Sequence, residues 1–157
     1  MKAASRVTTP YRRNLTVDAN GRGSDAAPAK TAALQAYLQS LAVMKPTAVL
    51  YPVPEVGWLP PRLNLAAVAL NRDPPQQIST SWQRMQQRNA VAHSLLDATT
   101  APNLLRVRPE QRLCNTVIAQ RCVVQAAGLL YYADDDHLSM LGARLVVGDL
   151  LAALGPH

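Results

Sequence analysis

Residues 47–51 read Thr-Ala-Val-Leu-Tyr, a short and almost continuously apolar run between two prolines. A run of this length and composition is typical of a β-strand that is buried on both faces. Before it, apolar residues recur at helical spacing over residues 28–45, and a Lys-Pro pair ends the pattern. This predicts an amphipathic helix of about four turns. A helix followed at once by a buried strand favours an α/β fold with a parallel sheet.

The rest of the chain continues to alternate between helical and strand patterns. Apolar spacing predicts a helix from about Thr80 to residue 98 and another over residues 139–154. Short apolar runs predict a strand at residues 104–107 and a hairpin made of residues 122–125 and 129–132. Helices and strands in alternation are again what an α/β fold requires.

Two stretches lack such a pattern. Residues 1–27 are predicted to form a loop-rich segment, because they contain a Gly- and Asn-rich run and little periodicity. Residues 62–78 are predicted to be an irregular connection that ends in Asp-Pro-Pro. On the helix that follows, His93 shares a face with polar residues, so we expect a solvated side chain.

The composition is that of one ordinary domain with a real core, because 48% of the 157 residues are apolar and 17% are charged. Aromatic residues make up only 4%, and Phe is absent, which excludes stacked-base recognition and aromatic cages as the main activity. The net charge of +6 comes from scattered residues, so we expect no nucleic-acid partner. Apolar stretches stop far short of the roughly 18 residues that a membrane span needs.

A proline-rich loop, residues 52–61, follows the apolar strand. It cannot continue the strand, because proline lacks the N–H that a sheet requires. In open α/β sheets, ligands bind at loops that leave the carboxyl ends of strands. Glu55 and Trp58 are therefore candidate substrate-binding residues. The alternative is a rigid loop whose Trp58 only covers the core.

Three of the ten acidic residues lie together at Asp134, Asp135 and Asp136, directly before His137, one of three histidines. Asp134 and His137 are at i and i+3, a spacing that places two side chains on one face of a helical turn. A carboxylate in that position can accept the Nδ1 proton of the imidazole and leave Nε2 free to take a proton from a nucleophile. Asp134 and His137 are therefore candidate catalytic residues.

Two other interpretations of this acidic segment stay open from the residues alone. The carboxylates suit a helix N-terminus capped by Ser139, in which case His137 is an accidental neighbour. They also suit a site for a hard cation, although the acids elsewhere are too scattered to complete one. We expect no bound metal and no cofactor.

The segment from Asp134 to Ser139, followed by Gly142-Ala143, resembles the terminal D-x-x-H-L-S-x-x-G-A block of SGNH hydrolases. It is most similar to the SGNH domain fused to membrane acyltransferases that O-acetylate cell-surface polysaccharides. Four further segments of that domain have counterparts here in the same order: residues 52–58, residues 78–81, residues 113–122 and Leu130-Tyr131. The resemblance covers about residues 30–154 and implies a three-layer α/β/α sandwich with a parallel sheet, similar to the SGNH and flavodoxin folds.

The resemblance also implies roles for residues. Asp134 would orient the imidazole and His137 would be the general base, while a Ser from an N-terminal Gly-Asp-Ser block would attack the acyl carbonyl. The chain has no such block, because Gly23-Ser24-Asp25 has the wrong order. We therefore expect residues 28–157 to be the C-terminal part of a domain that is incomplete at its N-terminus. The alternative is a catalytically inactive carbohydrate-binding or interaction domain.

The expected function is acyl-ester chemistry, either O-acetyl transfer to cell-surface polysaccharide or hydrolysis from it. The resemblance implies a membrane acyltransferase domain on the same longer chain, and a periplasmic position tethered to the inner membrane. It also implies a disulfide between Cys114 and Cys122, which would persist in the periplasm and not in a reducing cytosol. Two buried free thiols are the alternative.

Overall fold

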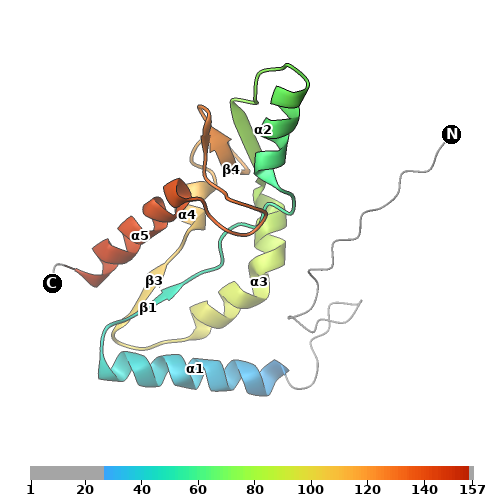
Figure 1. Cartoon of the computed structure of the whole chain (residues 1–157). Coiled ribbons are helices and arrows are strands. Elements are labelled where there is room, and N and C mark those ends of the chain that lie inside the picture. The colour runs from blue at the N-terminus through green and yellow to red at the C-terminus, as the bar shows by residue number, and fades with distance from the viewer. Residues whose placement is uncertain (1–26, 156–157) are drawn as a thin grey trace.

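The computed structural model describes residues 27–155 (Figure 1). The expected segment at residues 1–27, and with it Gly23-Ser24-Asp25, lies almost wholly outside the described residues. In chain order the elements are α1 (Ala27–Met44), β1 (Thr47–Leu50), α2 (Pro60–Ala69), β2 (Gln77–Ser81), α3 (Trp82–Ala98), β3 (Leu104–Val107), α4 (Glu110–Leu113), β4 (Arg121–Ala126), β5 (Leu129–Leu130) and α5 (Met140–Leu154).

The apolar strand β1 pairs with β3 in parallel, with Thr47 opposite Leu104 and Leu50 opposite Val107. Side chains of α1 and α3 pack on one face of this pair in a core cluster that contains Val49. Helix α5 packs on the pair from the other side, against β3 more than β1 (Figure 1). This mixed α/β arrangement, with helices around a parallel pair, confirms the predicted fold class.

The prediction that β1 is buried on both faces is wrong. Val49 and Tyr51 are buried, but Leu50, on the opposite face, is 52% exposed. The physical reason is that α5 lies mainly over β3. Within residues 27–155, the second face of β1 is therefore only partly covered.

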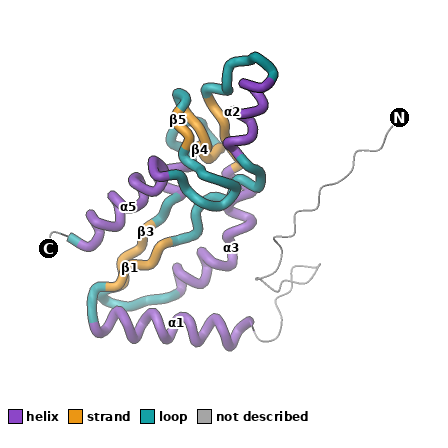
Figure 2. The backbone as a smooth tube through the Cα atoms, viewed as in Figure 1, coloured by secondary structure: helices purple, strands orange, loops and turns teal. Residues whose placement is uncertain are grey.

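A second, antiparallel sheet has the order β2-β4-β5 (Figure 2). The hairpin of β4 and β5 confirms the prediction, but β2 was predicted as an irregular connection and a helix start. Its sequence, Gln-Ile-Ser-Thr-Ser, has too few apolar residues to indicate a strand, and its pairing with β4 supplies the stabilisation instead. Helix α2 was also missed, since its two leading prolines suggested a loop, although proline is well tolerated in a first helical turn.

The start of α3 lies two residues later than predicted. Thr80 belongs to β2, and the hydroxyl of Ser81 accepts a hydrogen bond from the backbone N–H of Arg84 at 3.3 Å, which caps the helix. His93, on the same helix, was predicted to be solvated, and this prediction is wrong. Its ring packs edge-on against Tyr51 at 5.0 Å, because Tyr51 reaches across to α3 and donates a hydrogen bond to Asp97.

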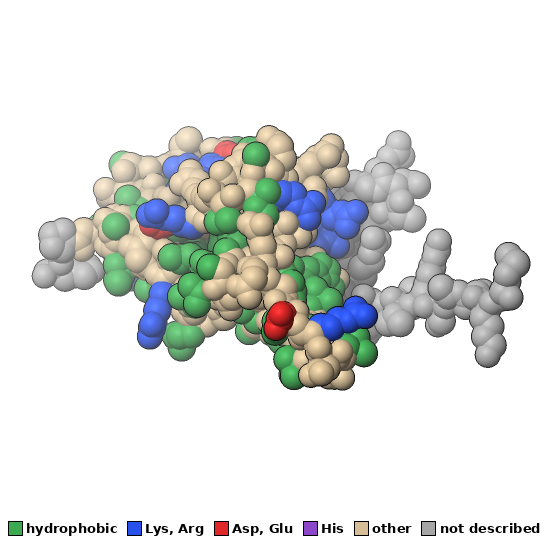
Figure 3. Space-filling view, turned by 90° about the horizontal axis from the view of Figure 1, so that it is seen from above, with side chains coloured by type: hydrophobic (Ala, Val, Ile, Leu, Met, Phe, Trp, Pro, Cys, Tyr) green, Lys and Arg blue, Asp and Glu red, His purple; other side chains and the backbone are tan. Residues whose placement is uncertain are grey.

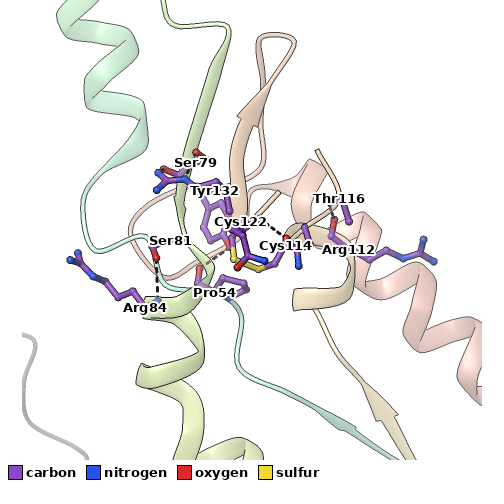
Figure 4. Close-up of a disulfide and its surroundings, with 12 residues drawn as sticks. Pro54, Ser79, Ser81, Arg84, Arg112, Cys114, Thr116, Cys122 and Tyr132 are labelled. Atoms are coloured by element: carbon purple, nitrogen blue, oxygen red, sulfur yellow. Dashed lines mark hydrogen bonds between the residues drawn. A yellow bond between two sulfur atoms is a disulfide. The ribbon is translucent and has the colours of Figure 1, made fainter. Parts of the chain in front are cut away.

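Cys114 and Cys122 form a disulfide, as the resemblance implied (Figure 4). Both residues are buried in the second core cluster, which also contains Val56 and Tyr132. The bond therefore fixes the start of β4 to the end of α4. The alternative of two free thiols is excluded.

Candidate active site

Asp134 organises the loop between β5 and α5. Its Oδ1 accepts hydrogen bonds from the backbone N–H of Asp136 at 3.0 Å and from that of His137 at 2.7 Å. An aspartate that binds backbone donors two and three residues ahead closes the chain into a tight turn. This turn brings Nδ1 of His137 to 2.9 Å from Oδ2 of Asp134 and 3.0 Å from Oδ1. The predicted pair is therefore in contact.

A second carboxylate reaches the same nitrogen. Oδ1 of Asp136 lies 2.8 Å from Nδ1 of His137. A proton on Nδ1 satisfies these carboxylate oxygens, and in the neutral imidazole Nε2 then keeps its lone pair. The contact of Asp136 with His137 was not predicted, because neighbouring residues normally point apart. Only the turn around Asp134 places both carboxylates on one imidazole.

The electrostatics of the loop follow from these contacts. The two backbone N–H donors, reinforced by His137, lower the pKa of Asp134 to about 2, so its carboxylate is charged at neutral pH. The hydrogen bond and the negative charge of Asp134, together with the charge of Asp136, raise the pKa of His137. Partial burial raises the pKa of Asp136. The imidazole is thus more basic than a free one, while its side chain is 72% exposed.

Ser139 anchors the loop at its far end. Its hydroxyl donates to the carbonyl of Leu130 at 2.7 Å and accepts the backbone N–H of Gly142 at 3.2 Å, which caps α5. The capping interpretation is therefore right for Ser139. A Cβ on Gly142 would lie 2.2 Å from the carbonyl oxygen of Tyr131, so only glycine fits at this point of the helix.

The proline-rich loop lies directly against the acidic loop. The backbone N–H of Val56 donates to the carbonyl of Asp135 at 2.7 Å. The buried hydroxyl of Tyr132 donates to the carbonyl of Pro54 at 2.7 Å (Figure 4), and burial raises the pKa of that hydroxyl. The structure therefore joins the two loops that the sequence singled out separately.

Glu55 and Trp58 take different positions on the proline-rich loop. Glu55 is exposed and forms an ion pair with Arg88 of α3, with 3.3 Å between Oε2 and the guanidinium nitrogen. Trp58 is half-buried and packs against the core cluster below the loop. Neither contact includes His137. A substrate-binding role for these two residues stays a prediction.

No serine hydroxyl hydrogen-bonds to His137 within residues 27–155. Ser79 and Ser81 are engaged by Arg121 and by the start of α3, and Ser139 caps α5. Ser5 and Ser24 lie outside the described residues. The described site thus contains an exposed imidazole whose Nδ1 contacts two carboxylates, and no described group hydrogen-bonds to its Nε2.

A cation could also be held here. Asp134, Asp136 and His137 each offer one ligand atom, and these atoms lie within 4.8 Å of one another. Calcium and magnesium prefer six or more oxygen ligands, and two carboxylates with an imidazole supply only a fraction of that number. The close pairing of Nδ1 with carboxylates suits a protonated imidazole nitrogen better.

One family model, described as an SGNH domain (fused to AT3 domains), matches residues 3–152. The matched span starts well before residue 30, where the resemblance was expected to begin. No curated protein and no solved structure matches the chain. Among the described residues, no helix is long and apolar enough to cross a membrane.

Proposed function

Because the chain belongs to the SGNH domain family, for which acyl-ester chemistry is the indicated function, we propose that His137 is its general base and Asp134 the orienting carboxylate. The observation that carries the proposal is the clamp on the imidazole. Carboxylates hold Nδ1 within 3.0 Å, while Nε2 is free and exposed. This is the arrangement that a proton-transferring histidine needs.

In this proposal the nucleophile is a serine outside residues 27–155. Nε2 of His137 takes the hydroxyl proton as the serine oxygen attacks the acyl carbonyl. The ester C–O bond then breaks, and the same proton passes to the departing alcohol. In the second half, His137 takes a proton from a sugar hydroxyl or from water as its oxygen attacks the acyl-serine. The bond between the acyl carbon and the serine oxygen then breaks, and His137 returns the proton to that oxygen, which regenerates the serine. The charge of Asp134 stabilises the imidazolium in both steps.

The acyl group and acceptor are proposed to be an acetyl group and a cell-surface polysaccharide. The family description, which notes fusion to AT3 domains, is in line with a membrane acyltransferase on the same chain that delivers the acetyl group. The disulfide indicates an oxidising compartment, which supports a position on the periplasmic side of the membrane. Glu55 and Trp58 are proposed to contact the sugar, since their loop is hydrogen-bonded to the loop of His137.

The test compares His137→Gln and Asp134→Asn with the unmodified chain inside its complete protein. O-acetyl content of the polysaccharide and labelling by a serine-directed phosphonate are measured in parallel. We expect both variants to lose activity by about 10³-fold or more, because base and orienter act as one unit. His93→Gln and Asp73→Asn are the matched controls, since both residues lie outside the clamp, and they should retain activity.

Activity that survives His137→Gln would contradict the proposal. In that case, loss of polysaccharide binding in Trp58→Ala would identify a non-catalytic binding domain. Activity that depends on an added divalent cation and disappears with a chelator would instead support the metal interpretation of Asp134, Asp136 and His137.

A further inference from the structure

Helix α2 (Pro60–Ala69) exposes apolar side chains over most of its surface. Leu63, Leu65 and Val68, with Leu70 just after the helix, are between 46% and 68% exposed. The helix contains a single charged residue, Arg62. A helix that is apolar on nearly all sides is normally buried. Within the described part of the chain, however, only the side that includes Pro60 is fully buried.

The distribution of these side chains around the helix favours one kind of partner. At about 100° per residue, Leu63 and Leu70 share one flank, whereas Leu65 and Val68 lie on the other. Asn64 lies between the flanks, and its amide donates to Gln125 at 2.8 Å, so this side faces the protein. A helix at a membrane interface lies in the plane of the membrane, with apolar side chains inserted below the headgroups and basic side chains among them.

The position of α2 allows such immersion, because the helix lies at one end of the molecule (Figure 1). The turn of the β4–β5 hairpin lies at the same end, where the backbone N–H of Gly128 donates to the carbonyl of Gln76. Next to it, Leu129 is 53% exposed. Seen from this end, apolar side chains are spread over the surface, with basic and some acidic side chains among them (Figure 3).

The charges near α2 suit an anionic surface. Arg62 on the helix and Arg72 just after it are exposed, and the whole chain carries a net charge of +6. Asp73 is the acidic residue that follows them. Long arginine side chains beside an apolar helix can reach lipid phosphates while the helix lies in the interface.

We propose that α2 and the β4–β5 turn insert into the surface of a membrane of anionic phospholipid. A ten-residue helix is about 15 Å long, so it lies in the interface and does not span the bilayer. This contact holds the domain against the bilayer. The proposal does not depend on the acyl-ester chemistry, and it fits a family whose members are described as fused to AT3 domains.

The experiment measures co-sedimentation of the whole chain with phosphatidylglycerol vesicles and with phosphatidylcholine vesicles. We expect preference for the anionic vesicles. Leu65→Gln/Val68→Gln should weaken binding about tenfold or more, through the loss of apolar contact with lipid. The matched control is Val43→Gln/Val91→Gln on α1 and α3, where both residues are 70% exposed, and it should bind as the unmodified chain does. Circular dichroism checks that both variants are folded.

Insertion itself is read from a tryptophan placed at the helix. Brominated lipid should quench the fluorescence of Leu65→Trp more than that of Val91→Trp. Equal quenching, or equal binding of the two double-glutamine variants, would overturn the proposal, since binding would then be adsorption by charge alone. Failure to bind vesicles, with a dimer that Leu65→Gln/Val68→Gln dissociates, would also overturn it and assign α2 to a contact between copies.

Discussion

Asp134 has two functions in its loop, because the same carboxylate binds two backbone donors and the imidazole of His137. An alanine at this position would therefore remove both the hydrogen bonds that close the turn and the carboxylate that contacts His137. The i and i+3 spacing made the pair predictable from the sequence. The approach of Asp136 to the same nitrogen was not predictable, since it depends on the turn that Asp134 closes.

The charge of Asp134 gives stability a defined pH dependence. Its pKa is about 2 in the folded chain and about 3.9 when unfolded. Its contribution is therefore present above about pH 4 and is lost as the pH falls towards 2. In urea titrations, the difference in unfolding free energy between the unmodified chain and Asp134→Asn should shrink over that window.

The stability contribution of His137 changes with pH in the opposite direction, because the pKa of His137 is raised from 6.5 in the folded chain. Its contribution to stability is complete below pH 6.5 and is lost as the pH rises through the folded pKa. The deficit of His137→Gln should therefore be largest in mild acid. A deficit that is constant from pH 5 to 9 would mean that His137 is not paired with the carboxylates.

Gly142 offers a second test at this scale. In Gly142→Ala the new methyl group would collide with the carbonyl of Tyr131, so either the helix or the hairpin end must move. We expect the free energy of unfolding to fall by about 2–3 kcal/mol. Gly148→Ala, on the same helix, meets nothing within 4 Å and should be neutral or slightly stabilising. Equal urea midpoints for the two variants would contradict this packing.

Among the elements, the segment from α4 to β4 depends on the disulfide. The loop between Cys114 and Cys122 spans a sequence separation of 8, and closing a loop of that size contributes about 2.5 kcal/mol in the chain-entropy model. Cys114→Ala/Cys122→Ala should lose about that much stability in urea titrations. A reducing agent should destabilise the unmodified chain similarly and leave the double variant unchanged.

The elements differ in how well the sequence predicts them. Helices α1, α3 and α5 have apolar periodicity over several turns, so they were found, although the start of α3 was placed two residues early. Strand β2 and helix α2 were missed. The five residues of β2 are mostly polar and form a strand only because β4 offers hydrogen bonds. The Pro-Pro pair at the start of α2 suggests a loop unless the helical turns after it are considered.

In the whole molecule, α3 connects the two core clusters. Met85 belongs to the cluster around the disulfide, and Leu96, on the same helix, packs on the cluster at the parallel strands. Met85→Ala should cost about 2–4 kcal/mol, because the side chain is only 2% exposed. Unfolding transitions followed by tryptophan fluorescence, which reports on Trp58 and Trp82 beside the cluster around the disulfide, and by circular dichroism should shift together. Transitions that separate would show that the clusters unfold independently.

The sequence by itself predicted the α/β class, a contact between Asp134 and His137 and, through a family resemblance, the disulfide. The fold class and the contact between Asp134 and His137 depend on local spacing, since a helical period or an i and i+3 relation is fixed by a few neighbouring residues. Only the tertiary structure decided that β1 has a partly exposed face, that His93 packs on Tyr51, and that the proline-rich loop joins the acidic loop. These features depend on which distant segments meet, and burial and backbone hydrogen bonds between such segments leave no periodic pattern in the chain.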